Sequence, residues 1–327
     1  MVYEGAAMTH HDANGPVIIA GSTHRELASS IASLLGTTPG RVRFNRFSNE
    51  NLKVCIEENV RDRDVFVVQT SCPPVNESLM ETLILVDALR SASAGRITAV
   101  MPYLPYARSD KQDEPGISIT ARLVADLLAT AGANRVLAMD LHSPQIVGFF
   151  RIPIDHVTAI PVLCEALLKG GAAGERVVVA TDIGEAKDAG RFAASMKLPL
   201  AVIDKRRSGD DEHAVPNSIV GDVKGRHALI VDDEIATGGT IMEAGELVVG
   251  MGAASVEAAV VHPVLSGNAM ERLRASTLRR LLVTDSIPLT HGKVDPRIEV
   301  VSVAPLLAEA IRRIHTGASL YDMASRR

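Results

Sequence analysis

The stretch Ala228-Leu229-Ile230-Val231-Asp232-Asp233-Glu234-Ile235-Ala236-Thr237-Gly238-Gly239-Thr240 leads from a strand-like apolar run into a helical pattern that starts at Ile241. The pair Gly238-Gly239 has no Cβ, so the loop can turn its backbone N–H groups inward. The hydroxyls of Thr237 and Thr240 and the positive end of the helix dipole add attraction for a phosphate dianion. This order of residues predicts a strand, a phosphate-binding loop and a helix within an α/β fold.

The carboxylates Asp232 and Asp233 lie one loop away from this phosphate-binding segment. Ionised carboxylates only accept hydrogen bonds, so they can bind sugar hydroxyls directly. They can also hold a Mg²⁺ that binds those hydroxyls. An ordinary strand-turn-helix connection with an acidic N-cap is the alternative. Paired Asp followed by Thr-Gly-Gly-Thr is a much longer signature than a glycine turn, and it favours a sugar-phosphate site.

The composition indicates a globular protein with two domains. Its 327 residues are 46% hydrophobic, which is enough for two apolar cores. A net charge of −5 and an aromatic content of 3%, without Trp, argue against general nucleic-acid binding, which uses basic faces and stacking platforms. We therefore expect phosphate binding to be local and no nucleic acid as a partner.

Cysteine usage and the lack of long apolar runs predict a cytoplasmic location. Cys55, Cys72 and Cys164 are widely spaced and odd in number, which fits buried thiols in a reducing compartment. Residues 1–15 have no apolar signal-peptide core, and no uninterrupted apolar run is long enough to cross a bilayer. We expect no membrane partner, and residues 1–15 to form an N-terminal extension.

Strand-like and helical segments alternate along the chain, which is typical of a mainly parallel sheet covered by helices. The pattern predicts strands at 17–20, 65–69, 97–101, 136–139, 177–180, 199–203, 228–231, 255–261 and 281–283. It predicts helices near 76–91, 118–130, 185–197, 240–250, 268–274 and 304–315. The capping box Thr23-His24-Arg25-Glu26 predicts a further helix that ends at Gly36.

The two halves of the chain carry a similar pattern. Gly132-Ala133-x-x-Val136-x-Ala138-x-x-x-His142 recurs 120 residues later as Gly252-Ala253-x-x-Val256-x-Ala258-x-x-x-His262. Each copy is interpreted as a helix end, a strand and the loop after it, which favours duplication over coincidence. We predict two similar α/β domains, 16–158 and 159–327, with Pro161 near the changeover.

A second polar constellation ends the first half, in the run Asp140-Leu141-His142-Ser143-Pro144-Gln145-Ile146-Val147-Gly148-Phe149-Phe150-Arg151-Ile152-Pro153-Ile154-Asp155. His142 follows the carboxyl end of a predicted strand, where open α/β sheets bind ligands. Taken alone, a histidine beside an acid fits a metal or phosphate role and a structural loop role equally well.

Several motifs together resemble those of ribose-phosphate diphosphokinases, over nearly all of residues 16–320. They are the run from Asp140 to Asp155, Val75-Asn76-Glu77, Tyr106-Ala107-Arg108-x-Asp110, Ile203-Asp204-Lys205-Arg206-Arg207, His262-Pro263-Val264-Leu265-Ser266-Gly267 and Ala304-Pro305-Leu306-Leu307-Ala308-Glu309-Ala310-Ile311. The resemblance implies two tandem phosphoribosyltransferase-like domains with mainly parallel sheets. It also implies a homo-oligomer, a hexamer or another dimer-based assembly, in which subunits share ATP sites.

The reaction implied by this resemblance transfers the β,γ-diphosphoryl group of Mg-ATP to the C1 hydroxyl of ribose 5-phosphate, giving 5-phosphoribosyl 1-diphosphate and AMP. Such chemistry depends on positioning and charge neutralisation. Lys205 and Arg207 are implied to be catalytic, on a loop that closes over the transferring group and stabilises its charge. The residues implied to bind ribose 5-phosphate are Asp232, Asp233, Ala236, Thr237, Gly238, Gly239 and Thr240.

The metal and nucleotide sites are implied by the same resemblance. Mg²⁺ is the implied cofactor, and His142 and Asp182 mark its site with ATP. The residues implied to bind ATP are Phe47, Asn49, Asn51, Arg108, Ser109 and Asp110. Phe47 would stack on adenine from a neighbouring subunit; a core Phe is the alternative, and the polar residues after it favour an exposed loop.

Departures from the family pattern mark where substrate preference can differ. Asn49 and Asn51 stand where acidic residues are usual, and Ser109 stands where Gln is usual. Ala236 replaces an Asp of the sugar-phosphate loop, as in many phosphoribosyltransferases, so we expect binding to persist. Glu185 adds a negative charge near a phosphate site.

Regulation is expected to differ as well. In the most familiar group of the family, phosphate activates and ADP inhibits through an Arg-rich stretch after the Arg-x-Asp motif. Here the equivalent residues 111–117 contain Lys111 as their one basic residue, beside Asp113 and Glu114. Arg forks suit phosphate and carboxylates repel it, so we predict activity without added phosphate.

Two other functions compete with the diphosphokinase hypothesis. A phosphoribosyltransferase would explain the Asp-Asp-x-x-Ala-Thr-Gly-Gly-Thr loop, but neither the run from Asp140 to Asp155 nor a duplicated chain. A non-catalytic subunit of a diphosphokinase assembly would be expected to have a degraded catalytic loop, whereas Lys205 and Arg207 are retained.

Overall fold

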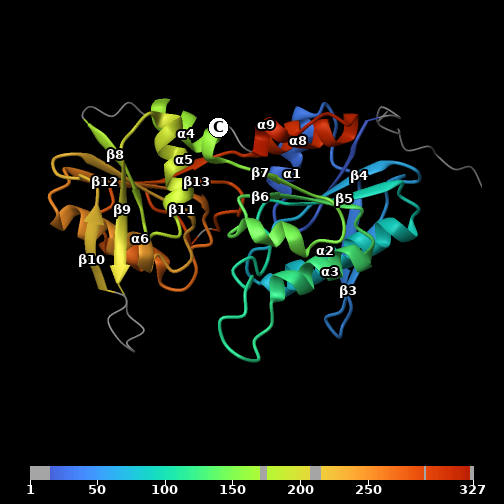
Figure 1. The fold of residues 1–327 in the computed structure, drawn as a ribbon. Helices are drawn as coiled ribbons and strands as arrows, with labels where there is room; N and C mark the ends of the chain where they lie inside the picture. Colours follow the sequence, from blue (N-terminus) through green and yellow to red (C-terminus); the bar gives the residue numbers. More distant parts are fainter. Residues whose placement is uncertain (1–14, 170–174, 207–214, 291, 325–327) are drawn as a thin grey trace, which may run out of the picture.

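The protein is an α/β molecule of two lobes that lie side by side, each built on a mainly parallel sheet (Figure 1). The computed structural model describes residues 15–169, 175–206, 215–290 and 292–324, with the backbone alone for 205, 206, 215–217 and 324. The first sheet is parallel, in the order β1 (Val17–Ala20), β4 (Asp64–Val68), β5 (Arg96–Met101), β6 (Arg135–Met139), β7 (Ile154–Val157).

The second sheet has β11 at its centre and is parallel except for β10. Its order is β10 (Val215–Val220), β9 (Leu200–Arg206), β8 (Arg176–Ala180), β11 (His227–Glu234), β12 (Ser255–His262), β13 (Arg280–Thr284), β14 (Ile298–Val301). A separate antiparallel pair is formed by β2 (Val42–Arg46) and β3 (Leu52–Ile56).

The helices lie on the faces of the sheets and bury apolar stripes against them. They are α1 (Arg25–Leu34), α2 (Val75–Ser91), α3 (Thr120–Ala131), α4 (Ile160–Lys169), α5 (Ala186–Met196), α6 (Gly239–Gly250), α7 (Ala269–Ala275), α8 (Ala304–Thr316), α9 (Tyr321–Ala324) and the 3₁₀ turn η1 (Pro144–Phe149). Among the described residues, none of them combines the length and apolar character needed to cross a bilayer.

The predicted strands and helices are all present, with ends that differ by a few residues. The predicted capping box is wrong in its position. His24, not Thr23, is the N-cap of α1, and its Nδ1 accepts a hydrogen bond from the Leu27 N–H at 3.4 Å. The Thr23 hydroxyl instead donates to Gln69 Oε1 at 2.6 Å, which ties the start of α1 to the end of β4.

The predicted repeat equates strands that do not correspond. The order β1-β4-β5-β6-β7 in the first sheet matches β8-β11-β12-β13-β14 in the second, and the antiparallel pair β2-β3 matches β9-β10. On this match the partner of β6 is β13, whereas the sequence repeat sets β6 against β12. Both copies do place a glycine with positive φ after a helix, Gly132 at 119° and Gly252 at 92°.

The two halves exchange the helices that follow their last strands. Helix α4 follows β7 of the first half but packs on α5 of the second, and α8 follows β14 but packs on α1 of the first (Figure 1). The Arg96 guanidinium donates to the Ile314 carbonyl at 3.0 Å, and His315 Nδ1 lies 2.8 Å from Asp64 Oδ2. A buried apolar cluster therefore runs through both halves. The predicted division at residues 158 and 159 stays a prediction.

Candidate active site

The predicted sugar-phosphate loop begins where the central strand β11 ends. Gly238 is the N-cap of α6 with a φ of 78°, in the left-handed region that favours glycine. Residues of both halves line one cleft with this loop: Arg108, His142, Thr181, Asp182, Glu185, Asp232, Asp233, Glu234, Ile235, Ala236, Thr237, Gly238, Gly239, Thr240 and Ile241. The first turn of α6 thus borders the cleft, which is an arrangement that attracts phosphate.

The paired carboxylates stand at the carboxyl edge of β11 and have different partners. Asp232 Oδ2 accepts a hydrogen bond from the Thr181 hydroxyl at 3.2 Å, and burial and the charge of Asp233 raise the pKa of Asp232. His142 Nδ1 lies 2.7 Å from Asp233 Oδ2. Burial opposes ionisation of Asp233, but the hydrogen bond and charge of His142 outweigh it and lower the pKa of Asp233. The same hydrogen bond raises the pKa of His142.

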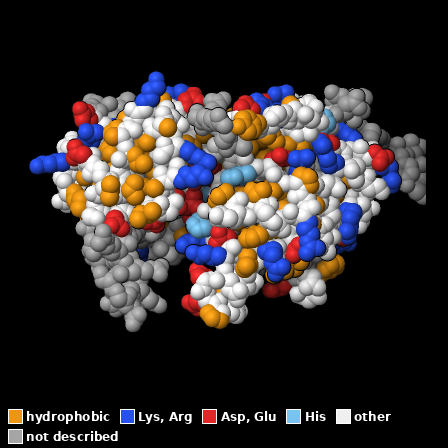
Figure 2. Space-filling view, in the orientation of Figure 1, with side chains coloured by type: hydrophobic (Ala, Val, Ile, Leu, Met, Phe, Trp, Pro, Cys, Tyr) orange, Lys and Arg blue, Asp and Glu red, His pale blue; other side chains and the backbone are white. Residues whose placement is uncertain are grey.

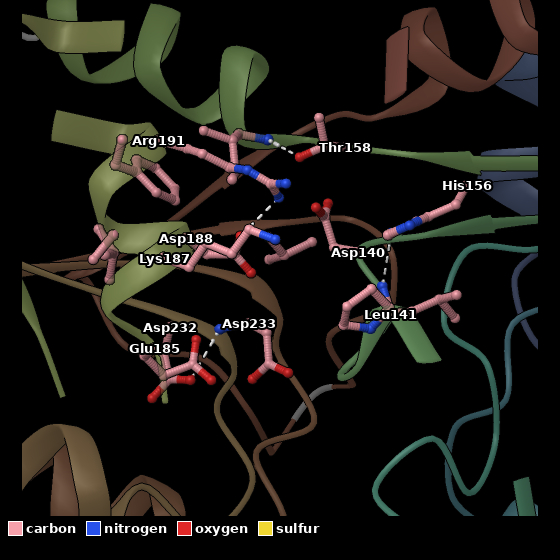
Figure 3. A pocket seen from close by; sticks show the side chains of 16 residues that line it. Asp140, Leu141, His156, Thr158, Glu185, Lys187, Asp188, Arg191, Asp232 and Asp233 are labelled. Atoms are coloured by element: carbon pink, nitrogen blue, oxygen red, sulfur yellow. Dashed lines mark hydrogen bonds and ion pairs between the residues drawn. The ribbon is translucent and has the colours of Figure 1, made fainter. Parts of the chain in front are cut away.

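Three carboxylates of the cleft could hold a metal ion together. Oxygen atoms of Glu185, Asp232 and Asp233 lie within 4.8 Å of one another, and Figure 3 shows the three side chains grouped at one edge of a neighbouring pocket. Burial and the charges of Asp233 and Asp182 raise the pKa of Glu185 to about 7. Asp182 borders the same cleft and accepts a hydrogen bond from the Glu185 N–H at 3.1 Å. The sequence indicates Glu185 only as an added negative charge near a phosphate site, not as a metal ligand.

The predicted nucleotide residues are divided between two places. Arg108 lines the cleft, and its Nη1 lies 3.2 Å from Glu234 Oε1. The Ser109 hydroxyl donates to the Ser118 carbonyl at 3.1 Å and so holds its own loop together. Ser109 and Asp110 are not among the described residues that border the cleft.

Phe47, Asn49 and Asn51 lie in the turn between β2 and β3, which also does not border the cleft in the described part of the chain. Phe47 is 56% exposed, and the ammonium of Lys53 lies 5.9 Å from its ring centroid. An exposed Phe excludes the alternative that this residue belongs to the core. Its role at an adenine site of a neighbouring subunit stays a prediction.

The predicted catalytic run Ile203–Arg207 lies within β9 as far as Arg206, rather than wholly in a loop. Lys205 belongs to this strand, opposite Pro216 of β10, and its side chain lies outside the described atoms. Arg207 lies outside the described residues altogether. Both roles stay predictions.

A second pocket adjoins the cleft at the junction of the halves, where the start of the run from Asp140 to Asp155 meets Asp232 and Asp233 (Figure 3). His156 Nε2 accepts a hydrogen bond from the Leu141 N–H at 3.0 Å, and burial and the charge of Arg191 lower the pKa of His156 to about 4. Asp140 accepts from the Ala159 N–H at 2.7 Å, and burial raises its pKa to about 7. Figure 2 shows basic, acidic and histidine side chains gathered along this junction.

Buried His262 ties the second half to the carboxyl end of β6, just before the loop that carries His142. Its Nε2 lies 3.2 Å from the Met139 carbonyl oxygen and 3.1 Å from that of Asp140. Its Nδ1 lies 3.0 Å from the Ser286 hydroxyl. Burial lowers the pKa of His262, so the neutral ring can donate to the carbonyls and accept from Ser286. The loop of His142 is thereby fixed against the second half.

Known proteins resemble this chain over nearly its whole length. A family model described as the N-terminal domain of ribose phosphate pyrophosphokinase matches residues 16–132, and one described as a phosphoribosyl synthetase-associated domain matches residues 211–324. The ribose-phosphate pyrophosphokinase of Clostridium acetobutylicum is 48% identical over 299 residues, 91% of this chain and 93% of that protein. That of Deinococcus radiodurans is 46% identical over 308 residues, 93% of this chain and 96% of that protein.

A solved structure agrees with these sequence relatives. The phosphoribosylpyrophosphate synthetase of Mycobacterium smegmatis superposes with a TM-score of 0.88 at 42% identity, covering 93% of this chain and 100% of that chain. The match includes both halves, and with them the cleft that they form. The chain belongs to the ribose-phosphate pyrophosphokinase family.

Proposed function

We propose that this protein transfers the β,γ-diphosphoryl group of ATP to the C1 hydroxyl of ribose 5-phosphate. One observation carries the proposal: a single cleft is lined by the sugar-phosphate loop of the second half and by Arg108 and His142 of the first. A sugar phosphate on one side and a nucleotide on the other would meet in this cleft. Holding two reactants together supplies a large part of the acceleration of phosphoryl transfer.

The residues at the end of β11 would hold the sugar. Backbone N–H groups and hydroxyls from Thr237 to Thr240 bind the 5-phosphate, while Asp232 and Asp233 accept hydrogen bonds from ribose hydroxyls. The C1 oxygen then forms a bond to the β-phosphorus. The bond between that phosphorus and the bridging oxygen of AMP breaks, and the hydroxyl proton is released.

The carboxylates of the cleft fit Mg²⁺. Glu185, Asp232 and Asp233 offer oxygen ligands within 4.8 Å of one another, and hard oxygen donors are what this ion prefers. His142 and Asp182, which border the same cleft, would help to organise the metal-nucleotide complex directly or through water. When bound, Mg²⁺ neutralises phosphate charge and orients the diphosphoryl group.

Cationic side chains would complete the neutralisation. Arg108 presents a guanidinium fork that suits phosphate oxygens. Lys205 and Arg207, at and beyond the end of β9, would stabilise the oxygens that gain charge in the transition state. Retention of both speaks against a non-catalytic subunit. The homo-oligomeric assembly, with a neighbouring Phe47 at the adenine, and the cytoplasmic location stay predictions.

Product analysis tests the reaction. The pure protein is incubated with Mg²⁺, ATP and ribose 5-phosphate, and the products are identified by mass. We expect AMP and 5-phosphoribosyl 1-diphosphate in equal amounts. The Lys205→Ala variant, prepared in the same way, excludes a contaminating enzyme. ADP as the main product, or no turnover with any pentose phosphate, would refute the proposal.

A further inference from the structure

Glu234 is an acid with a largely buried side chain at the meeting point of the two halves. It is the last residue of β11, two positions before the sugar-phosphate loop, and its side chain is 8% exposed. Its Oε1 pairs with Arg108 Nη1 at 3.2 Å, and its Oε2 accepts a hydrogen bond from the Tyr103 hydroxyl at 2.9 Å. Each carboxylate oxygen therefore has a partner in the first half.

On one side Glu234 contacts Tyr103, which is partly buried, whereas on the other side it contacts Arg108, which is largely exposed. The Tyr103 ring packs on His262 with centroids 5.0 Å apart, and His262 is fixed by the hydrogen bonds described above. In contrast, the Arg108 side chain is 64% exposed. A long exposed side chain samples many rotamers, so a ligand that immobilises it binds with a smaller gain in free energy. The contact with Glu234 already restricts the rotamers of Arg108 before the ligand binds, which reduces this entropic cost.

We propose that Glu234 is a positioning residue that holds the Arg108 guanidinium in place to receive the nucleotide. The inference rests on the proposed function, in which Arg108 binds ATP. It goes beyond that function by assigning nucleotide affinity to a residue of the sugar-phosphate half that does not itself contact the nucleotide. The pair also links the two halves, because Glu234 ends β11 of the second half and Arg108 belongs to the first half.

Two opposing effects of the carboxylate can be separated. Glu234 orients Arg108, which strengthens nucleotide binding, and it repels an anionic ligand, which weakens binding. Orientation requires Arg108, whereas repulsion does not. We expect orientation to be the larger effect, so removing the charge of Glu234 should weaken nucleotide binding when Arg108 is present, and should leave it unchanged or tighten it when Arg108 is absent.

A double-mutant cycle measures this difference. Dissociation constants of Mg²⁺-α,β-methylene-ATP are determined by calorimetry without ribose 5-phosphate, for the natural chain and for Glu234→Gln, Arg108→Ala and the double variant. We expect Glu234→Gln to raise the dissociation constant about threefold to tenfold in the natural chain, the cost of immobilising one long side chain. In the Arg108→Ala background we expect no rise.

Two further variants support the comparison. Tyr103→Phe removes a hydrogen bond to Glu234 but no charge, and we expect a smaller rise in the dissociation constant that also needs Arg108. Glu257→Gln, which breaks a pair with Arg176 at 3.6 Å near the start of β12, is the matched control and should leave binding unchanged. Thermal unfolding shows whether each variant folds.

Two results would overturn the inference. One is an equal loss of affinity in both Arg108 backgrounds, since Glu234 would then act on the fold. The other is unchanged affinity in Glu234→Gln and in Tyr103→Phe. If the natural chain binds the nucleotide but transfers no diphosphate, the proposed function fails while the cycle still decides the role of Glu234.

Discussion

Replacing His156 by Gln should make the stability of the protein less sensitive to acid. His156 lies on β7 and lines the pocket at the junction of the halves (Figure 3). Its Nε2 accepts a hydrogen bond from the Leu141 N–H, which requires the neutral ring. Gln can accept the same hydrogen bond through Oε1 but does not titrate. The variant therefore removes a proton-binding group and keeps the contact.

The size of the effect follows from the two pKa values. The pKa of His156 is about 4 in the folded chain, through burial and the charge of Arg191, against 6.5 for an unperturbed histidine. Between these values the unfolded chain binds a proton that the folded chain does not, so the free energy of unfolding falls as the pH falls. Linkage gives a loss of about 2 kcal/mol from this residue between pH 7.5 and pH 5.

Urea unfolding at pH 7.5 and pH 5 of the natural chain and of His156→Gln measures the effect. We expect the natural chain to lose about 2 kcal/mol more stability than the variant over this interval. Asp140, with its pKa near 7, contributes with the opposite sign in both proteins and cancels from the difference. Above pH 7.5 the two curves should run parallel. Equal losses between pH 7.5 and pH 5 would show that His156 is not held neutral.

Three further predictions concern activity. Lys205→Ala should lower kcat at least ~10²-fold with a smaller effect on KM, and unchanged turnover would make Lys205 a surface charge. His142→Ala and Asp182→Asn should each raise the Mg²⁺ concentration that gives half of full activity; identical titrations in both would place the metal elsewhere. Activity should not need added phosphate, because Lys111 lies 3.8 Å from Asp113 on an exposed loop; a strict requirement in an activity-versus-phosphate curve would contradict this.

Periodicity predicts the buried strands and the amphipathic helices, but not elements whose signal is weak or misleading. Strands β2 and β3 are half-exposed, and β7 has four residues, so their patterns are short and mixed. The pattern does not predict helix α4, because Pro161 suggests a boundary at that point of the chain. It lies in the first turn of α4, where the missing N–H costs nothing.

In the candidate site, features formed by consecutive residues could be predicted, whereas contacts between distant segments could not. The loop from Ala236 to Thr240 could be predicted because its chemistry is continuous in sequence. The grouping of Glu185 with Asp232 depends on β8 lying beside β11, and the pairing of Glu234 with Arg108 depends on the docking of the halves. Neither contact can be predicted from the sequence of a single segment.

The exchange of α4 and α8 provides a physical reason why the cleft can be so acidic. Burial and the charges of neighbouring carboxylates raise the pKa values of Glu185 and Asp232, so keeping these groups ionised in the folded chain opposes folding. Here the halves are joined by a continuous apolar cluster that includes Leu163 of α4 and Leu307 of α8. Because that burial holds the lobes together, the cleft need not be stabilised by its own contacts. Its carboxylates can therefore keep uncompensated negative charge until a cation binds.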